Sequence, residues 1–534
     1  TTASGSTNSW EQLISGVWTT ISNSPPYNAT GLATKTVYIR HNITLIGNNT
    51  APKVVVENGG VLNTSTVQAT FGNLLVKTGG IFNRQANGSG ISASGIFEVE
   101  NNATVNFYHT STTSRSSSIW AGTEKFHGDS NFVFKSGDNT SNFLIIQTND
   151  DVSLFNGSCF GNLIVELEAG QLQLLPSGFN KVLANNLIFR KNTGNYRISD
   201  TNYSFSILNN LEIENTYLNT LSALTTSGTA TINIGGNFIH NGSNIFRLAN
   251  NASAVITLNI DKNLQVNSGT LDVNFTSGAT STINLKGDLT VGTTAALLAN
   301  NGTNATVNYN GTGDGLTSET TQTIDVANAA TASNIAFNVN SGAYVRLINQ
   351  NLAIGTNSQF IVKNGGTLDF GFKSDGTALN IERVASQNGQ KFTVENGGTL
   401  MITSPEGITG FGNYTGNVQI GASSIDNRKF DAGAIYHYYG KSNQATGGGL
   451  PDGLTAKVIV DLQTNATNEN LEFTSTGITK FNSTGTLEIK RGKVLDIPGA
   501  GFRNNVIENE DGESDAQKGN ILMTGGRYIV SVLG

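Results

Sequence analysis

Hydrophobic and polar residues alternate in short runs along most of the chain, and the runs end at polar pairs or glycines. Three segments align closely, TINIGGNFIHNG from Thr231, TLNIDKNLQVNSG from Thr257 and TINLKGDLTVG from Thr282, at spacings of 26 and 25 residues. Alternation with a period of two places one face of a strand in a core and the other face in solvent. Each segment therefore predicts a strand, a corner and a second short strand.

An Asn or Asp followed by a large apolar residue marks one corner of each repeat. Successive members are 24, 24, 27, 26 and 25 residues apart, in the series Asn162, Asn186, Asn210, Asn237, Asn263 and Asp288. This period is too short for a four-stranded propeller blade, and the repeat sequences lack the strict consensus of leucine-rich repeats. The period fits one coil of a parallel β-helix. Asn tolerates the left-handed backbone of a tight corner, and stacked Asn side chains can form an amide ladder. We expect these six residues to form a structural corner ladder.

A second corner is marked by the phrase ENGG, which occurs in VVVENGGVLN (54–63) and in FTVENGGTLMI (392–402). Related phrases, KTGG at 77–80 and KNGG at 363–366, follow the same kind of strand. Because glycine takes positive φ at little steric cost, it suits a sharp turn. In the second copy we expect a strand to end at Val394-Glu395 and the next to begin at Thr399.

These patterns predict an all-β protein, a right-handed parallel β-helix with coils of about 23–27 residues and an N-terminal cap. The cap is assigned to residues 1–48, which carry two tryptophans and a Pro-Pro pair, and the solenoid to 49–534. The gap between Asp288 and Asn334 is about double the usual length, so irregular coils are expected there. The chain ends in RYIVSVLG, which resembles a strand cut in mid-course, so the solenoid is expected to continue. Loop insertions are predicted near 108–129, 295–330, 425–455 and 500–520.

Composition narrows the range of partners. Hydrophobic residues make up 37% of the 534 residues, enough for a continuous core, whereas charged residues make up only 13%. The net charge is −7 and no basic stripe is present, which argues against nucleic acid. No run of about 18 apolar residues occurs, so no membrane span is predicted. The single cysteine, Cys159, excludes an internal disulfide and is interpreted as a buried structural thiol.

Acidic residues are the first candidates for chemistry, because polysaccharide lyases and hydrolases also occur on β-helices. Such enzymes need clustered carboxylates in a groove, and the pair Asp150-Asp151 is better interpreted as a solvated corner. The one dense acidic cluster, ENEDGESD, misses the spacing of a calcium loop, so a solvated loop is favoured over a calcium site. The calcium candidates in this cluster are Glu508, Glu510, Asp511 and Asp515.

The stretch YHYYGKSNQ (436–444) is a second candidate. Tyr436 and Tyr438 share one face of the predicted strand, and exposed tyrosines could stack on sugar rings, which makes them candidate glycan contacts. Packing across strands is the commoner role of such a pair. Ile435 stands where a phosphate loop requires Gly, and the five histidines lack metal-binding spacing. No cofactor other than calcium is therefore considered.

Several phrases resemble a known family. FIVKNGGTLDFG (360–371) and FTVENGGTLMI are similar to coils of very large secreted and cell-surface proteins of Bacteroidota, especially flavobacteria. More specific is AGAIYHYYGKSNQATGGGLPDGLTAKVIVDL (432–462), which is similar to a recurrent element of those proteins, Y-x-Y-x-G, then N-Q-x-T-G, then G-L-P. A degenerate copy occurs in VNYNGTGDGLTSETTQTIDV (307–326), where Tyr309, Gly311 and Gln322 match.

The resemblance implies an adhesin-like β-helical segment that is exported by the type IX secretion system and serves adhesion or gliding outside the cell. The matched motifs are structural and transfer no catalytic residue. We therefore expect a non-enzymatic, monomeric rod, secreted or on the cell surface, that contacts glycans or solid surfaces weakly and multivalently. The alternative is a polysaccharide lyase or hydrolase, or a carbohydrate-binding module, on the same fold. A groove with three or more carboxylates and a nearby Lys or Arg would favour the enzyme.

Overall fold

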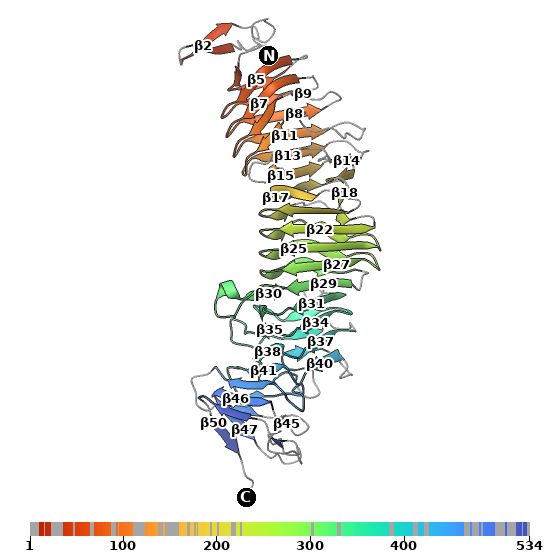
Figure 1. The fold of residues 1–534 in the computed structure, drawn as a ribbon, viewed down its shortest axis with the longest axis vertical. Helices are drawn as coiled ribbons and strands as arrows, with labels where there is room; N and C mark the ends of the chain where they lie inside the picture. Colours follow the sequence, from red (N-terminus) through yellow and green to blue (C-terminus); the bar gives the residue numbers. More distant parts are fainter. Residues whose placement is uncertain are drawn as a thin grey trace. The chain divides into compact units, whose positions relative to one another are not determined.

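A computed structural model of the chain divides into two compact units, residues 1–246 and 247–534, and the division falls within strand β24 (Ile245–Ala249). In both units the regular secondary structure of the described residues is almost entirely β-strand, as the composition predicts (Figure 1). In the first unit the structure describes residues 10–14, 17–22, 36–45, 49–64, 69–86, 92–93, 95–109, 123–136, 142–144, 160–167, 171–175, 178, 180–192, 195–199, 202–214, 220–224 and 227–246. In the second unit it describes 247–300, 304–327, 333–383, 389–409, 415–420, 427–463, 470–472, 480–481, 484–496, 508–509, 520–525 and 527–530.

In the first unit, parallel strands stack coil upon coil in three columns (Figure 1). The first column contains β3 (Thr36–Ile39), β5 (Asn49–Val56), β7 (Ala69–Val76), β10 (Ile96–Val99) and β12 (Thr123–Phe126), with β9 (Ser92–Ala93) beside β7. The second contains β4 (Asn42–Thr44), β6 (Val61–Asn63), β8 (Ile81–Ala86), β11 (Thr104–His109), β13 (Asn131–Ser136), β15 (Phe160–Leu167) and β17 (Asn180–Asn192). From β17 it continues as β19 (Tyr203–Ile207) with β22 (Gly228–Ile234), and as β20 (Leu211–Ile213) with β23 (Phe238–His240). The third contains β14 (Asn142–Leu144), β16 (Gln171–Gln173), β18 (Asn195–Ser199) and β21 (Thr220–Leu224).

The second unit repeats this arrangement. One column contains β25 (Ala254–Ile260), β27 (Thr280–Leu285), β29 (Asn304–Tyr309), β31 (Ile335–Val339), β34 (Gln359–Val362), β37 (Lys391–Val394) and β40 (Arg428–Phe430). Another contains β26 (Leu264–Asn274), β28 (Leu289–Leu298), β30 (Gln322–Val326), β32 (Tyr344–Leu347), β35 (Thr367–Asp369), β38 (Thr399–Ile402), β41 (Ile435–Tyr438), β43 (Lys457–Asp461), β46 (Thr486–Arg491) and β49 (Asn520–Met523). Smaller sheets contain β33 (Leu352–Ile354), β36 (Ile381–Arg383) and β39 (Val418–Gln419); β42 (Gln444–Ala445), β44 (Asn470–Glu472), β47 (Lys493–Asp496) and β50 (Arg527–Val530); and β45 (Lys480–Phe481) with β48 (Glu508–Asn509).

These columns confirm the predicted parallel β-helix, and alternation explains its core. In the second unit Leu264 pairs with Leu289 one coil away, which matches the predicted spacing. Along β25 the side chains alternate between buried and less buried positions, so one face of each strand fills the interior. Aromatic residues stack along the axis, and the ring centroids of Phe360 and Phe392 lie 6.1 Å apart. Burying each such side chain stabilises the fold by about 1.5–3 kcal/mol. The described residues contain no helix long and apolar enough to cross a membrane.

The ENGG phrase forms the predicted corner. β37 ends at Val394 and β38 begins at Thr399, with a β-turn between them in which the N–H of Gly398 donates to the carbonyl of Glu395 at 2.9 Å. Gly397, the third residue of this turn, has φ of 77°, which is the left-handed conformation that a type II turn requires there. Its N–H also donates to the carbonyl of Gly433 in the next coil at 3.0 Å. The turn therefore joins two strands and also stacks on its neighbour.

In two pairs of adjacent coils, the first residues of these turns carry opposite charges. Glu57 forms an ion pair with Lys77 at 3.1 Å in the first unit, and Glu395 forms one with Lys363 at 3.4 Å in the second. Such partly exposed pairs each contribute about 1 kcal/mol or less. The alternation of ENGG with KTGG and KNGG thus places opposite charges above one another, where two equal charges would repel.

The N-terminal segment departs in part from the predicted cap. β1 (Trp10–Ile14) and β2 (Val17–Ser22) form an antiparallel hairpin, unlike the coils that follow. However, β3 and β4 lie within residues 1–48 and already pair in parallel with β5 and β6. Among the described residues, parallel stacking is therefore already present at Thr36, within the predicted cap, and TVYI and NIT carry the strand pattern of the repeat without its glycine corner.

The interruption predicted after Asp288 is a single enlarged coil. Leu289 pairs with Ile324, so the next corner after Asp288 lies at Thr323 and the series does not continue at Asn334. The extra length lies in residues 312–321, within the insertion predicted at 295–330. In the insertion predicted at 108–129, residues 123–126 instead form regular strand β12. Most of 500–520 lies outside the described residues, and in 425–455 regular strands β40, β41 and β42 occur.

The corner geometry predicts different costs for two glycine substitutions. In Gly397→Ala the new Cβ would overlap Oδ1 of Asn364, whereas at Gly376, with φ of 86°, no atom lies within 4 Å of the corresponding position. Both variants strain the backbone by about 1–2 kcal/mol, and only Gly397→Ala adds a collision within the stack. Hydrogen exchange should show a larger loss of protection for Gly397→Ala than for Gly376→Ala. Equal losses would contradict this account of the corner.

Candidate functional site

The predicted corner ladder is present in the first unit. The side-chain amide of Asn162 donates to Oδ1 of Asn131 at 3.0 Å, and that of Asn186 donates to Oδ1 of Asn162 at 2.8 Å. Further along, the donor is a backbone N–H instead of a side-chain amide. The N–H of Asn210 donates to Oδ1 of Asn186 at 3.0 Å, and the N–H of Asn237 donates to Oδ1 of Asn210 at 2.9 Å. Each of these corner residues is therefore bonded to a neighbouring coil, as the sequence predicts.

The second unit continues the same chemistry. The N–H of Asp288 donates to Oδ1 of Asn263 at 2.9 Å, and Asp288 in turn accepts the N–H of Thr323 at 2.7 Å. One part of the prediction is wrong: none of the six ladder residues has positive φ, because the bend is made without the left-handed conformation. Non-glycine residues with positive φ among the described residues are Asn102, Asn334, Asn349 and Asn357. The side-chain oxygens of the ladder residues accept hydrogen bonds from the adjacent coil.

Further asparagine columns run along strands that sequence analysis did not single out. In the first unit, Asn63 donates to Asn42 at 2.7 Å, and the column continues to later coils. In the second, Asn284 donates to Asn259 at 2.8 Å. The remaining members are Asn83 and Asn106 in the first unit, and Asn308 and Asn338 in the second. The outward-facing Asn in segments such as TLNI and TINL is the sequence feature that could have predicted these columns.

A buried glutamine joins the two ends of the loop formed by residues 312–321, where this loop extends out of the coil. Gln322 is the first residue of β30, and its Oε1 accepts the N–H of Gly311 at 2.7 Å. Its Nε2 donates to two carbonyls of the preceding coil, those of Leu285 at 3.1 Å and Gly287 at 2.8 Å. We call this arrangement a glutamine bracket.

The same bracket occurs a second time. Oε1 of Gln444, the first residue of β42, accepts the N–H of Gly440 at 2.7 Å, and Nε2 donates to Ile402 at 3.2 Å and Ser404 at 2.9 Å. Both glutamines are buried, with 5% and 3% exposure for Gln322 and Gln444. A Cβ on either bracketed glycine would collide with the glutamine side chain, which explains the glycine. The Tyr-x-Gly and Gln positions shared by 307–326 and 432–462 therefore have a structural role.

The bracket replaces a missing piece of backbone pairing. A side-chain amide has the same donor and acceptor as a peptide group, so it can extend the parallel ladder past the end of a strand. It satisfies buried backbone groups that would otherwise cost about 1–3 kcal/mol each. The segment between glycine and glutamine is then free to vary: residues 312–321 in one bracket and 441–443 in the other.

The longer segment forms one side of a groove in the second unit. The groove has a volume of about 820 Å³. Its floor consists of three stacked corners, 261–263, 286–288 and 310–312, and its wall includes residues 318 and 320–322. Lys286 and Asp261 on the floor form an ion pair at 2.7 Å, with more than half of each side chain exposed. The ladder residues Asn263 and Asp288 thus also line a surface.

The loop that forms the wall is held by its own hydrogen bonds and by a tyrosine. Oδ1 of Asp314 accepts the N–H of Leu316 at 3.0 Å and the hydroxyl of Thr320 at 2.8 Å, beside the 3-10 turn η2 (Ser318–Thr320). These bonds lower the pKa of the Asp314 carboxyl. Gly315 lies against the ring of Tyr344, and any Cβ there would overlap the ring. The loop is therefore held by its own hydrogen bonds and by its contact with the ring of Tyr344.

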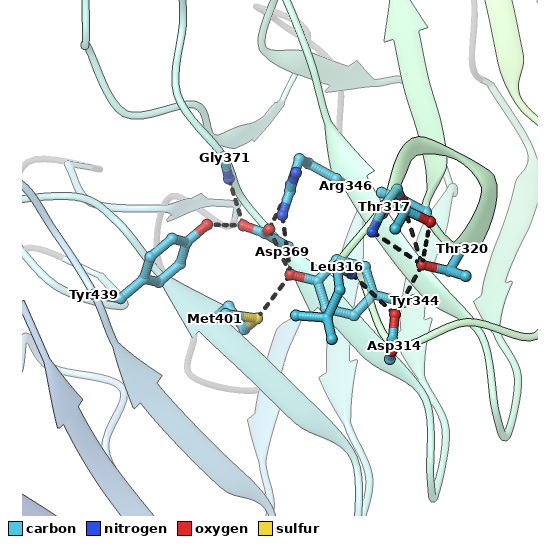
Figure 2. A network of polar contacts seen from close by, with 11 residues as sticks. Asp314, Leu316, Thr317, Thr320, Tyr344, Arg346, Asp369, Gly371, Met401 and Tyr439 are labelled. Carbon is cyan, nitrogen blue, oxygen red and sulfur yellow. Dashed lines mark hydrogen bonds and ion pairs between the residues drawn. The ribbon is translucent and has the colours of Figure 1, made fainter. Parts of the chain in front are cut away.

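Tyr344 belongs to a polar network centred on Asp369, which Figure 2 shows. Asp369 is fully buried and accepts hydrogen bonds from the Tyr344 hydroxyl at 2.7 Å and from Nε of Arg346 at 2.6 Å. The hydroxyl of Tyr439 and the N–H of Gly371, the latter at 2.8 Å, bind its other oxygen. Burial, and then the Asp369 charge, raise the pKa of Tyr344, so its hydroxyl stays protonated and donates. Every contact holds the carboxylate in place, which is the arrangement of a structural anchor.

The two tyrosines proposed as glycan contacts are not exposed. Tyr436 and Tyr438 are completely buried, and their hydroxyls donate to the carbonyls of Asp431 at 2.8 Å and Thr446 at 3.0 Å. Burial raises the pKa of both hydroxyls. The glycan prediction for this pair is corrected accordingly: they share a face, but that face points into the core, where aromatic area stabilises most.

The acidic candidates are only partly described. Glu508 begins strand β48, and the other three calcium candidates, Glu510, Asp511 and Asp515, lie outside the described residues, as do Asp150 and Asp151. Among the residues that the structure describes, no group of three or more His, Cys, Asp or Glu side chains is placed to hold a metal ion.

One buried carboxyl group has an altered ionisation. Asp272 on β26 is 2% exposed, and burial raises its pKa to about 6, against the opposing effects of the Asn300 N–H and of Arg247. Arg247 lies over the ring of Phe275 at 3.5 Å, and burial lowers the pKa of its guanidinium. Asp272 lies on a strand of the core and not in the groove.

Comparison with known proteins adds no assignment: no protein family, no curated protein and no solved structure gives a match to this chain.

The bracket predicts a large effect for a nearly isosteric substitution. Gln444→Met removes three hydrogen bonds and leaves buried backbone groups unpaired, so the coil should lose about 2–4 kcal/mol of stability. The matched control is Gln419→Met, which removes one partly exposed bond to the carbonyl of Gly416 and should cost less than about 1 kcal/mol. Hydrogen exchange around Gly440 measures the difference, and similar values for the two variants would refute the bracket.

The buried Asp272 predicts a specific pH dependence. Its pKa in the folded chain, about 6, is above the ordinary aspartate value of 3.8, so the folded state binds the proton more tightly. The stability that this carboxyl contributes is therefore present below about pH 4 and is lost as the pH rises through about 6. Relative to wild type, Asp272→Asn should become more stable by an amount on the order of 2 kcal/mol between pH 4 and pH 7.

The control for this titration is Asp375→Asn. The N–H of Thr377 donates to Asp375 at 2.8 Å and lowers the pKa of its carboxyl, so the stability that this group contributes is lost as the pH falls. Between pH 4 and pH 7, denaturant unfolding should therefore show a pH-dependent stability difference from wild type for Asp272→Asn and a nearly constant one for Asp375→Asn, whose contribution is lost mainly below about pH 4. A flat difference between wild type and Asp272→Asn would contradict the assigned pKa.

Proposed function

We propose that this chain is a non-enzymatic structural and adhesive β-helix segment of a large secreted or cell-surface protein. The observation that supports it most directly is the use of polar side chains in stacking: corner amides, asparagine columns and glutamine brackets all bond one coil to the next. Such a repeat resists local opening because each coil is held by its neighbours on both sides. It provides a stiff support for laterally displayed loops.

The route of export and the biological setting rest on the sequence likeness. The element at 432–462 and its copy at 307–326 resemble coils of exported Bacteroidota proteins, and this supports export by the type IX secretion system and a role in adhesion or gliding. The two brackets give this recurrent element a physical reason to recur, because it closes a coil around segments of different length, 312–321 and 441–443. The partners of this proposal are the export machinery and surface glycans or solid surfaces.

The second candidate function is carbohydrate binding, and the groove at 261–322 favours it. Two carboxylates, Asp261 and Asp288, occur among the described residues that line this groove, with two lysines beside them. The lyase or hydrolase alternative calls for three carboxylates in such a groove. The proposal therefore takes binding, and not turnover, as the activity of the surface.

The proposal is tested by measuring adhesion and turnover together. Beads coated with the purified chain should be retained on glycan-coated surfaces under flow, and albumin-coated beads should not. Incubation with neutral and acidic polysaccharides should release no reducing ends and no unsaturated products. Turnover of any polysaccharide, or retention equal to that of albumin beads, would exclude this function. Surface labelling of producing cells with and without the type IX translocon tests the export route.

A further inference from the structure

We infer that the groove of the second unit binds a short, uncharged, hydroxyl-rich segment of a glycan chain. This inference rests on the proposed adhesive function and assigns part of it to one place. The groove lies where three successive corners of the stack meet the wall formed by the loop 312–321. Its volume of about 820 Å³ lies within the range of small-ligand sites.

The charges in the groove favour a neutral ligand. Asp261 and Asp288 are balanced by Lys262 and Lys286, all of which line the groove. Lys286 is already paired with Asp261 at 2.7 Å, so an anionic ligand would have to compete with the aspartate, and a cationic one with the lysine. A neutral ligand can accept from the ammonium and donate to the carboxylate without breaking the pair.

The polar groups of the groove match hydroxyl groups. A sugar hydroxyl both donates and accepts, and the groove offers both kinds of partner close together, including the exposed hydroxyls of Thr312 and Ser318. The two glycines of the floor, Gly287 and Gly311, let the stacked corners pack closely, because a Cβ there would meet Asn263 and Gln322. The described lining residues include no aromatic side chain, so hydrogen bonding and not ring stacking provides recognition.

The wall of the groove is already in place before a ligand arrives. Gln322 holds the end of the loop through its bonds to Leu285 and Gly287, and the N–H of Gly313 donates to the carbonyl of Gly342 at 3.1 Å. The ring of Tyr344 supports the middle of the loop, and Asp369 fixes its hydroxyl (Figure 2). A preformed wall avoids the entropy cost of ordering a loop on binding.

The test uses the full chain and a panel of neutral tetrasaccharides with cellulose, xylan, mannan and starch linkages, together with tetragalacturonate as an anionic probe. Titration calorimetry should detect at least one neutral tetrasaccharide. Ser318→Trp, which places a large ring at the wall, should weaken that binding at least ten-fold. The matched control is Ser374→Trp, at an exposed turn outside the groove, which should bind as the wild type does.

A charge variant gives a readout that steric damage would not. Asp261→Asn replaces a charged acceptor by a weaker, neutral one and leaves Lys286 without its carboxylate partner, so neutral binding should fall several-fold and tetragalacturonate binding should rise. Absence of neutral binding, equal effects of the two tryptophan variants, or tightest binding of tetragalacturonate to the wild type would overturn the inference. If beads carrying Ser318→Trp adhere as the wild type does, the inference fails while the adhesive function stands. Turnover of a tetrasaccharide would instead remove the proposed function.

Discussion

The stacked columns of this fold depend on one constraint: the backbone hydrogen bonds of a parallel β-helix run along its axis, so each coil must return its corner to the same place. The stacked turns meet this demand directly, since Gly365 donates to Gly397 and Gly397 donates to Gly433, at 2.9 and 3.0 Å. Side chains reinforce it, because corner amides bond to the coil above or below. Low overall charge suits this design, because a charged side chain at every corner would repel its copy one coil away.

An insertion within a coil could shift the pairing register between adjacent coils. In this chain the glutamine bracket maintains that register. In both brackets a Tyr-x-Gly sequence ends one strand and a Gln begins the next, and the amide of that Gln bonds the glycine and two carbonyls of the coil before. The tyrosine is inward and fully buried in each case, Tyr309 in one and Tyr438 in the other. The core contact and the amide therefore fix both ends of the segment, and the register of the coil does not depend on the length of that segment.

Local sequence was sufficient where the structure is locally determined. The limits of β37 and β38 around Gly397 follow from alternation and from glycine's conformational freedom, and the corner ladder follows from its period. Prediction failed where a long-range choice decides. Alternation shows that Tyr436 and Tyr438 share a face but not which face is inward. Gln322 bonds Leu285, 37 residues earlier, so no local pattern could reveal the bracket. The groove depends on how the bracketed loop folds against Tyr344, which the residue spacing does not encode.

The different roles of inward and outward side chains determine which parts of the surface can bind a ligand. Inward side chains fill the core, and many outward ones on the strands are engaged in columns such as that of Asn284, so strand faces offer mainly repetitive stacking contacts. Distinct chemistry must then come from corners and from the loops that leave them. The bracket at Gln322 spans residues 312–321 and supplies a wall, whereas the bracket at Gln444 spans only 441–443. Loop length within a fixed bracket is therefore the variable by which such a repeat gains a groove without altering the stack that supports it.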